Sequence, residues 1–145
     1  MVRAAHSVEI GRPAEQVFAY ATALEHWPEW ALRVLSVRQT PAGPLREGVT
    51  LAITNRLLGR TVETPYTVTA YEPNRRLAFR STAGPVPAEF TFSFAPADGG
   101  TRVTEVVEMA PRGVLRLAGP LLKSLSERQF AANHRALKER LEASV

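Results

Sequence analysis

Cysteine is absent from this chain of 145 residues. Disulfide bonds and thiolate chemistry are therefore excluded. No stretch reaches the roughly 18 consecutive apolar residues that a membrane-spanning helix requires. The first residues also lack the apolar segment of a signal peptide. Together these absences argue against a membrane span and make the cytoplasm the expected location.

Motifs for cofactors, metals and nucleophilic catalysis are also missing. The sequence has no glycine-rich phosphate loop and no G-x-S-x-G motif. His6, His26 and His134 are isolated, and their spacing matches no metal-ligand motif. We therefore expect neither a cofactor nor a bound metal.

The basic residues form no dense cluster, although the formal net charge is +4 and the pI is near 10.1. Almost all of the positive charge is arginine, and it is scattered along the chain. Aromatic residues are not interleaved with these arginines as a stacking platform for nucleic acid would require. A nucleic-acid partner is therefore not expected.

The composition fits one globular domain that spans residues 1–145. Hydrophobic residues make up 45% of the chain and charged residues 22%, which is ordinary for a soluble protein. A chain of this length can bury a sizeable core. The order of the predicted elements must therefore indicate what kind of domain it is.

Residues 112–142 are the only segment long and periodic enough to predict a major helix, because apolar residues recur there at steps of three and four. They are Val114, Ala118, Leu121, Leu122, Leu125, Ala132, Ala136, Leu137 and Leu141. Gly119 and Pro120 interrupt the pattern, since proline lacks an N–H and disfavours helix at the residue before it. We predict a short first piece over residues 112–118 and a main helix with Pro120 in its first turn. A continuous helix with a kink is the alternative.

The rest of the chain is mostly typical of strands separated by turn residues. Alternating apolar and polar residues predict a first strand over residues 2–10, and Pro13 then favours a short helical pair that ends near Pro28. Six further strands are predicted over residues 32–40, 49–55, 61–71, 76–82, 86–94 and 101–109. Pro65 predicts an edge or a bulge within its strand. Sequential strands with short turns form an antiparallel sheet, so the predicted class is α+β, with the long helix across the sheet.

Polar residues on apolar strand faces are the candidates for a ligand site, because a pocket is mostly apolar with a few convergent polar groups. By strand alternation these residues are His6, Asn55, Ser81 and Glu105. Glu105 lies between two valines on its strand face, and burial would raise its pKa toward a value useful for proton transfer. A bulge or a shifted register would instead place this carboxylate at a water-filled mouth or on the outside.

Two further features each allow two interpretations. Gln129 and Asn133 continue the apolar face of the helix beyond Leu125, so they form either an edge that touches solvent or a polar spot in a cavity wall. Leu57 and Leu58 occupy a predicted hairpin tip. They form either a lid over a cavity mouth or a transient contact with a membrane or a partner.

The order of elements and five short motifs resemble the SRPBCC (START-like) superfamily, most closely its bacterial polyketide cyclase/dehydrase and lipid transport branch. The motifs are Pro13-Ala14-Glu15-Gln16-Val17-Phe18, Trp27-Pro28-Glu29-Trp30, Tyr71-Glu72-Pro73-Asn74-Arg75-Arg76-Leu77-Ala78-Phe79, Gly100-Thr101-Arg102-Val103-Thr104 and Leu137-Lys138-Glu139-Arg140-Leu141-Glu142. The resemblance covers nearly the whole chain. It implies a helix-grip fold, in which a seven-stranded curled antiparallel sheet wraps around a long C-terminal helix, with two short helices after the first strand. The motifs are specific for the fold and much less so for the function.

The resemblance implies that a small hydrophobic ligand, such as a lipid, a quinone or a polyketide-like molecule, binds in a cavity between sheet and helix. One alternative is a cyclase or dehydratase that acts on an aromatic or polyketide substrate in the same cavity, with Glu105 as its acid/base. Another is a protein-interaction module, as in chaperone- or ribosome-associated members. The residues expected to contact the ligand are Trp27, Trp30, Leu51, Ile53, Asn55, Tyr66, Phe79, Ser81, Phe90, Phe92, Leu125 and Gln129. The two tryptophans would cap one end of the cavity or fasten the short helix to the sheet.

Overall fold

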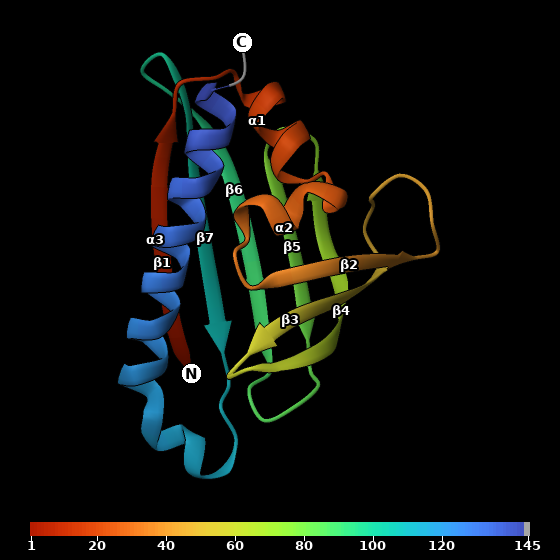
Figure 1. The fold of residues 1–145 in the computed structure, drawn as a ribbon, viewed down its shortest axis with the longest axis vertical. Helices are drawn as coiled ribbons and strands as arrows, with labels where there is room; N and C mark the ends of the chain where they lie inside the picture. Colours follow the sequence, from red (N-terminus) through yellow and green to blue (C-terminus); the bar gives the residue numbers. More distant parts are fainter. Residues whose placement is uncertain (144–145) are drawn as a thin grey trace.

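The computed structural model describes residues 1–143, which form seven strands and a long C-terminal helix (Figure 1). The strands are β1 (Val2–Ile10), β2 (Val34–Thr40), β3 (Thr50–Leu57), β4 (Arg60–Glu72), β5 (Arg76–Ser81), β6 (Ala88–Ala97) and β7 (Gly100–Met109). The α-helices are α1 (Ala14–Ala21), α2 (Trp27–Trp30) and α3 (Gly119–Ala143), and the 3₁₀ helices are η1 (Leu24–His26) and η2 (Gly113–Ala118). The predicted α+β helix-grip architecture is confirmed.

All seven strands belong to one antiparallel sheet in the order β1-β7-β6-β5-β4-β3-β2. Strands β2 to β7 follow one another across the sheet because short connections join successive strands. β1 departs from this order and pairs with β7, from Val2 opposite Met109 to Ile10 opposite Thr101. The first strand and the last strand, which are far apart in the sequence, therefore meet at one edge of the sheet.

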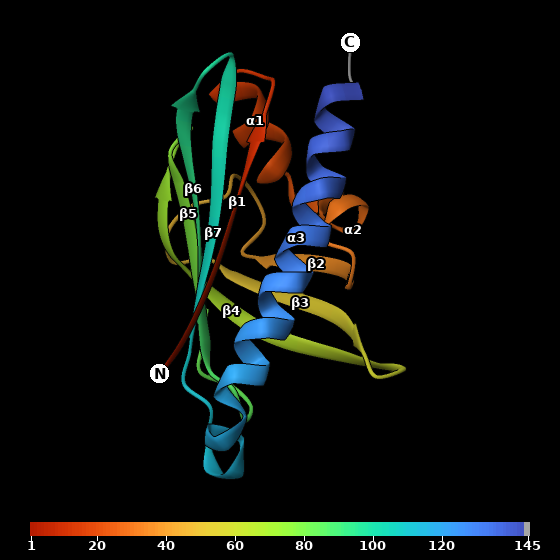
Figure 2. The ribbon, with the colours of Figure 1, turned by 90° about the vertical axis from the view of Figure 1, so that its left-hand side faces the viewer.

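The sheet curls where β4 changes partners. β2, β3 and the first part of β4 cross the direction of β5 to β7 at a steep angle (Figures 1 and 2). The register of β4 shifts between Val68 and Ala70, and β5 pairs with β4 only from Thr67 onward. Pro65 lies in the part of β4 that pairs with β3 alone, where its missing N–H is tolerated. Because a bulge bends its strand and increases the local twist, this region shapes the concave face of the sheet.

The C-terminal helical segment changes from a 3₁₀ helix to an α-helix at Gly119, whose backbone is itself helical, so the two predicted pieces follow each other without a break. η2 ends at Ala118, and α3 continues for 25 residues with Pro120 in its first turn, where the missing N–H needs no helical partner. The first piece is a 3₁₀ helix. A Cβ atom added to Gly119 would lie 3.3 Å from Cγ2 of Val2, so the glycine allows the start of α3 to approach β1 closely.

α3 lies along β1 on the concave side of the sheet (Figures 1 and 2). Its buried large side chains are Phe130, His134, Leu137 and Leu141. The predicted apolar row is wrong at Leu121 and Leu125, which are 59% and 48% exposed, whereas Leu122 packs partly buried against the core. Steps of three and four fit more than one row on a helix, and only packing selects the row that faces the sheet. No helix within residues 1–143 is long and apolar enough to cross a membrane.

The main core lies between the concave face of the sheet, α1, α2 and the C-terminal half of α3. Phe18 of α1 packs edge-on against Phe94 of β6, with ring centroids 5.1 Å apart. Leu137 of α3 is completely buried in the same core. Each such side chain stabilises the fold by about 1.5–3 kcal/mol relative to an exposed position. This core fixes α2 and α3 over the sheet, and the pocket lies beside them.

Candidate ligand pocket

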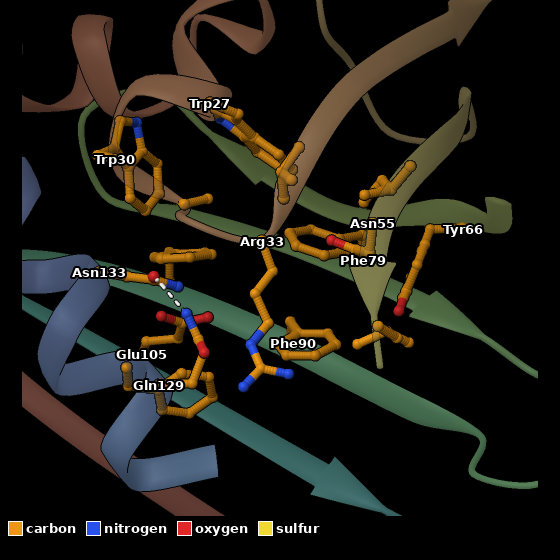
Figure 3. Close-up of a pocket in the computed structure, with 16 residues that line it drawn as sticks. Trp27, Trp30, Arg33, Asn55, Tyr66, Phe79, Phe90, Glu105, Gln129 and Asn133 are labelled. Atoms are coloured by element: carbon orange, nitrogen blue, oxygen red, sulfur yellow. Dashed lines mark hydrogen bonds between the residues drawn. The ribbon is translucent and has the colours of Figure 1, made fainter. Parts of the chain in front are cut away.

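A pocket of about 210 Å³ lies between the concave face of the sheet, α2 and α3 (Figure 3). It is lined by Trp27, Trp30, Ala31, Arg33, Val34, Ile53, Asn55, Leu57, Tyr66, Phe79, Phe90, Phe92, Glu105, Gln129, Phe130 and Asn133. Pockets for drug-sized ligands measure roughly 300–1,000 Å³. The volume of this pocket is therefore below that range.

Aromatic side chains from neighbouring strands form one wall of the pocket. Phe79 of β5 stacks on Phe90 of β6, with ring centroids 5.5 Å apart and planes at 20°. Tyr66 of β4 and Trp27 of α2 pack on the ring of Phe79 at centroid distances of 5.4 and 5.5 Å. These contacts arise because strand alternation directs every second residue to the concave face. The result is a closely packed aromatic wall on one side of the pocket.

Glu105 supplies the carboxyl group of the pocket lining. Strand pairing places it opposite His6 of β1 and Phe92 of β6, and the residue is only 5% exposed. Burial raises the pKa of Glu105, and the hydrogen bond with His134 opposes this rise in part. The predicted placement of this carboxyl on the apolar face is confirmed. The alternative, in which Glu105 lies at a watery mouth or outside, is excluded.

His134 connects this carboxyl group to a second histidine. Nε2 of His134 lies 2.9 Å from Oε1 of Glu105, and Nδ1 of His134 lies 2.7 Å from Nδ1 of His6. His134 has no exposed surface, whereas His6 is partly exposed. The prediction that these histidines are isolated is wrong for both of them. Residues 6 and 134 are far apart in the sequence, and they meet because β1 pairs with β7 and α3 packs along β1.

His6 lies beside one further charged group. Burial and the proximity of His134 lower the pKa of His6, and the charge of Glu127 opposes that shift. Glu127 of α3 also accepts a hydrogen bond from the backbone N–H of Ala5, at 3.3 Å. Lys123, one turn earlier on α3, pairs with Glu127 at 3.6 Å. The solvent side of His6 is thus a polar edge formed by β1 and α3.

Gln129 and Asn133 form a second polar group at the pocket. Nε2 of Gln129 donates to Oδ1 of Asn133 at 2.8 Å, and the backbone N–H of Leu32 donates to the same oxygen at 3.0 Å. Both side chains line the pocket and are partly exposed, so features of both interpretations are present: a polar part of the pocket wall at an edge that touches solvent. Arg33, just before β2, is exposed and extends toward Gln129 (Figure 3). These groups make one side of the mouth polar.

One indole group in the pocket lining has an unused donor. Trp30 is 2% exposed, and its Nε1 is a buried side-chain nitrogen without a hydrogen-bond partner among residues 1–143. The Nε1 of Trp27 instead donates to the carbonyl of Ala21 at 2.8 Å. Leaving a buried donor unpaired costs about 1–3 kcal/mol. Trp27 is therefore fastened to α1, whereas the indole N–H of Trp30 is buried without a partner among residues 1–143.

Most of the residues predicted to contact a ligand line this pocket, and three do not. Leu51 is completely buried in the core. The residues of the same strand that line the pocket are Ile53 and Asn55. Ser81 is buried at the end of β5, where its hydroxyl accepts from the N–H of Ala83. Leu125 lies on the exposed side of α3. These three positions have the right alternation or periodicity, and their position along the element places them away from the pocket.

The pocket is also lined by Asn133 and Leu57, which the sequence analysis considered as cavity wall and lid, and by four residues that it missed. The four are Ala31, Arg33, Val34 and Phe130. Phe130 could have been found, because it precedes His134 and Leu137 on one helical row. Leu57 is 40% exposed at the mouth, whereas Leu58 is fully exposed at the tip of the β3–β4 hairpin. A transient contact of these leucines with a membrane or a partner stays a prediction.

A curled seven-stranded sheet with a long helix across its concave face and an apolar pocket between them defines a helix-grip protein. The chain belongs to the polyketide cyclase / dehydrase and lipid transport family, whose sequence pattern matches residues 1–142. No curated protein sequence matches the chain.

Solved structures of the same fold share little sequence with this chain. A protein of Thermus thermophilus has a TM-score of 0.80 at 20% identity, with 98% of both chains covered. The Zhui aromatase/cyclase from Streptomyces sp. R1128 has a TM-score of 0.80 at 16% identity, covering 97% of this chain and 93% of that chain. A START superfamily protein from Mycobacterium smegmatis has a TM-score of 0.78 at 17% identity, with 99% of both chains covered. These similarities show a common fold, and the ligand must be inferred from the pocket itself.

Proposed function

We propose that this protein binds a small hydrophobic molecule with a flat ring system between the sheet and α3. The observation that carries the proposal is the aromatic wall of Phe79, Phe90 and Tyr66 beside a space of about 210 Å³. Apolar surface removed from water contributes about 25 cal/mol per Å² to binding before the cost of association. Membership of a family named for polyketide cyclases and lipid transport supports this class of ligand.

Two polar groups would orient the ligand: Glu105 deep in the pocket and Arg33 at its mouth. Protonated Glu105 donates to a carbonyl oxygen, and the ionised form accepts from a hydroxyl. Arg33 at the mouth offers a guanidinium to a carboxylate, a phosphate or a carbonyl. The ligand class is therefore a ring system with an oxygen substituent at its buried end and a polar or anionic group outside, as in a quinone or a polyketide-like molecule.

The binding proposal can be tested with the neutral fluorescent probe N-phenyl-1-naphthylamine. Asn55→Trp fills the pocket from β3, and Thr54→Trp is its matched control because adjacent strand residues point to opposite faces. We expect the wild type and Thr54→Trp to bind the probe with similar affinity, and Asn55→Trp to lose at least tenfold in affinity. Equal binding by all three proteins would contradict the proposal, provided that circular dichroism shows all three to be folded.

A second candidate function is catalysis by a cyclase or dehydratase in the same pocket. One observation favours it: the buried carboxyl of Glu105, whose pKa is raised by burial, has a histidine 2.9 Å away. General acid–base catalysis requires a group whose pKa lies near the working pH. Here Glu105 would transfer the proton, and the pocket walls would hold the substrate in a reactive conformation.

Glu105→Gln separates the carrier from the enzyme. For an enzyme we expect turnover of an aromatic polyketide substrate to fall by about 10²–10⁴-fold, the usual contribution of a general acid or base, while binding is retained. A carrier should show only a modest change in binding. If Glu105→Gln retains both binding and turnover, Glu105 is not the acid/base.

A further inference from the structure

We propose that Glu105, His134 and His6 form a proton relay that connects the floor of the pocket with solvent beside β1. The proposal deepens the acid/base role of Glu105 described above and rests on that role for its use in catalysis. Its existence as a relay depends only on the three side chains and their hydrogen bonds. It can therefore be tested without any ligand.

The relay is continuous because each ring nitrogen of His134 forms a hydrogen bond. Nε2 of His134 lies 2.9 Å from Oε1 of Glu105, and Nδ1 lies 2.7 Å from Nδ1 of His6. His134 is completely buried, so it exchanges protons only through these two neighbours. His6 is partly exposed on β1, which is an edge strand, and its Nε2 remains to exchange with water. A neutral imidazole donates at one nitrogen and accepts at the other, which is the property that a relay needs.

Two arrangements of protons satisfy both hydrogen bonds. In the first, Nδ1–H of His6 donates to Nδ1 of His134, and Nε2–H of His134 donates to the ionised carboxylate of Glu105. In the second, the protonated carboxyl of Glu105 donates to Nε2 of His134, and Nδ1–H of His134 donates to Nδ1 of His6. Each hydrogen bond is kept and its direction is reversed.

The transfer between the two arrangements balances. A proton taken up from solvent first adds to Nε2 of His6, which gives an imidazolium. The Nδ1 proton of His6 then moves to Nδ1 of His134, and the Nε2 proton of His134 moves to the carboxylate of Glu105. One proton has entered from solvent and one has reached the pocket, and His134 is neutral before and after. Because these are proton transfers alone, no oxidant or other reactant is needed.

The electrostatics of the two ends favour such an exchange. Burial raises the pKa of Glu105 from its ordinary value of 4.5, whereas burial and His134 lower the pKa of His6 from 6.5. The two shifts bring the ends of the relay closer in proton affinity. The other charged groups on this side are Glu127, whose charge raises the pKa of His6, and Lys123, which pairs with Glu127. Phe130 and Phe92 complete the packing around the buried part and carry no charge.

The position of the relay explains what it would contribute. β1 runs along α3 at one edge of the sheet, whereas the strands β3 and β2, which contribute to the mouth, lie at the opposite edge (Figure 1). A ligand that fills the pocket therefore covers Glu105 from the mouth and leaves His6 open to water. The carboxyl group can be reprotonated while the substrate is still bound, with no water admitted to the pocket.

The test is nuclear magnetic resonance of the ligand-free protein, with ¹⁵N shifts of the histidine rings and ¹³C shifts of the glutamate carboxyls followed against pH. We expect His134 to change from the Nε2–H to the Nδ1–H tautomer at the same pH at which Glu105 becomes protonated. In His6→Phe this coupled change should be lost, because Nδ1–H of His134 then has no acceptor. His26→Phe is the matched control, since His26 pairs with Glu29 elsewhere, and it should retain the change.

Two results would overturn the relay. His134 could keep one tautomer throughout the titration of Glu105, as a purely structural histidine would. It could also become protonated at both ring nitrogens, as an imidazolium paired with an ionised Glu105. If His6→Phe does not fold, the wild-type titration alone still decides between these outcomes. Loss of probe binding by the pocket with an intact tautomer change would reject the proposed ligand and leave the relay in place.

Discussion

Two pairs of polar side chains, each with at least one member on α3, lie at the same pocket, and their surroundings give them different properties. The inner group, Glu105 with His134, is buried and contains only ionisable side chains. The outer group, Gln129 with Asn133, is partly buried and contains only neutral amides. Residues 133 and 134 are neighbours in the sequence, and the helix turns them to different depths. Residue type decides that only the inner group can hold or move a proton, and burial raises the pKa of its carboxyl.

The two groups also differ in the number of proton arrangements that their hydrogen bonds allow. The amides of the outer group are fixed, because Oδ1 of Asn133 accepts from Gln129 and from the backbone of Leu32. The inner group keeps both of its hydrogen bonds in two protonation states. The outer group is thus suited to orient a ligand, and the inner group to exchange a proton with one.

The largest expected effect comes from breaking the inner group with His134→Leu. Glu105 would then be buried without its partner, which costs about 1–3 kcal/mol. Glu105→Leu combined with His134→Leu should recover much of this loss, because replacing both buried partners by apolar groups is often neutral or stabilising. Urea unfolding at neutral pH measures both effects. A double variant as unstable as the single variant would argue against an energetic coupling of these two side chains.

The second expected effect is a pH dependence of the unfolding free energy that arises from the inner group and not from the outer group. The raised pKa of Glu105 means that, above pH 4.5, the folded protein keeps a proton that the unfolded chain has released. Stability contributed by this group therefore falls as the pH rises from 4.5 to the folded pKa, by at most about 1.4 kcal/mol per pH unit. We expect the unfolding free energy of the wild type, minus that of Glu105→Gln, to fall over this interval and then level off.

His6 would act with the opposite sign. Its pKa is lowered from 6.5, so the unfolded chain binds the extra proton and stability rises toward pH 6.5. His6 is present in both proteins, and the subtraction removes its direct contribution. A difference that stays constant with pH would show that Glu105 titrates as an ordinary exposed carboxyl.

A smaller effect is expected when the outer group is broken with Asn133→Ala. The variant removes the acceptor of two hydrogen bonds, but the site is partly exposed and water can replace the lost partner. We expect a loss of about 0.5–1.5 kcal/mol in unfolding free energy, with no dependence on pH between 4.5 and 6.5. A loss of unfolding free energy that varies with pH would mean that a titrating group lies at the mouth. The outer group would then not differ from the inner group in its response to pH.

The smallest effect is expected from Arg33→Ala at the mouth. Binding of an anionic naphthalenesulfonate probe should weaken about two- to fivefold, in line with the strength of exposed ion pairs. Binding of neutral N-phenyl-1-naphthylamine should not change, and Arg75→Ala, in the β4–β5 turn, serves as the control. Equal losses for the two probes would mean that Arg33 acts by shape and not by charge.

Much of the fold was predictable because local rules specify it. Strand alternation placed Glu105 on the concave face, and the restricted backbone of Pro120 located the start of α3. The contact between His6 and His134 could not be predicted from spacing, because it depends on how β1 returns to the edge of the sheet. The prediction that Leu125 contacts the ligand is wrong for a related reason. Helical periodicity defines a row of residues, and tertiary packing decides which row is buried. The ligand itself is not encoded in any local rule.

The central claim is that an apolar ligand occupies the space between the aromatic wall and α3. Intermolecular nuclear Overhauser effects from bound N-phenyl-1-naphthylamine test it most directly. We predict contacts from the probe to Ile53, Val34 and the ring of Phe90. Contacts confined to the exposed apolar side chains of η2 and the start of α3, such as Val114 and Leu121, would contradict the account.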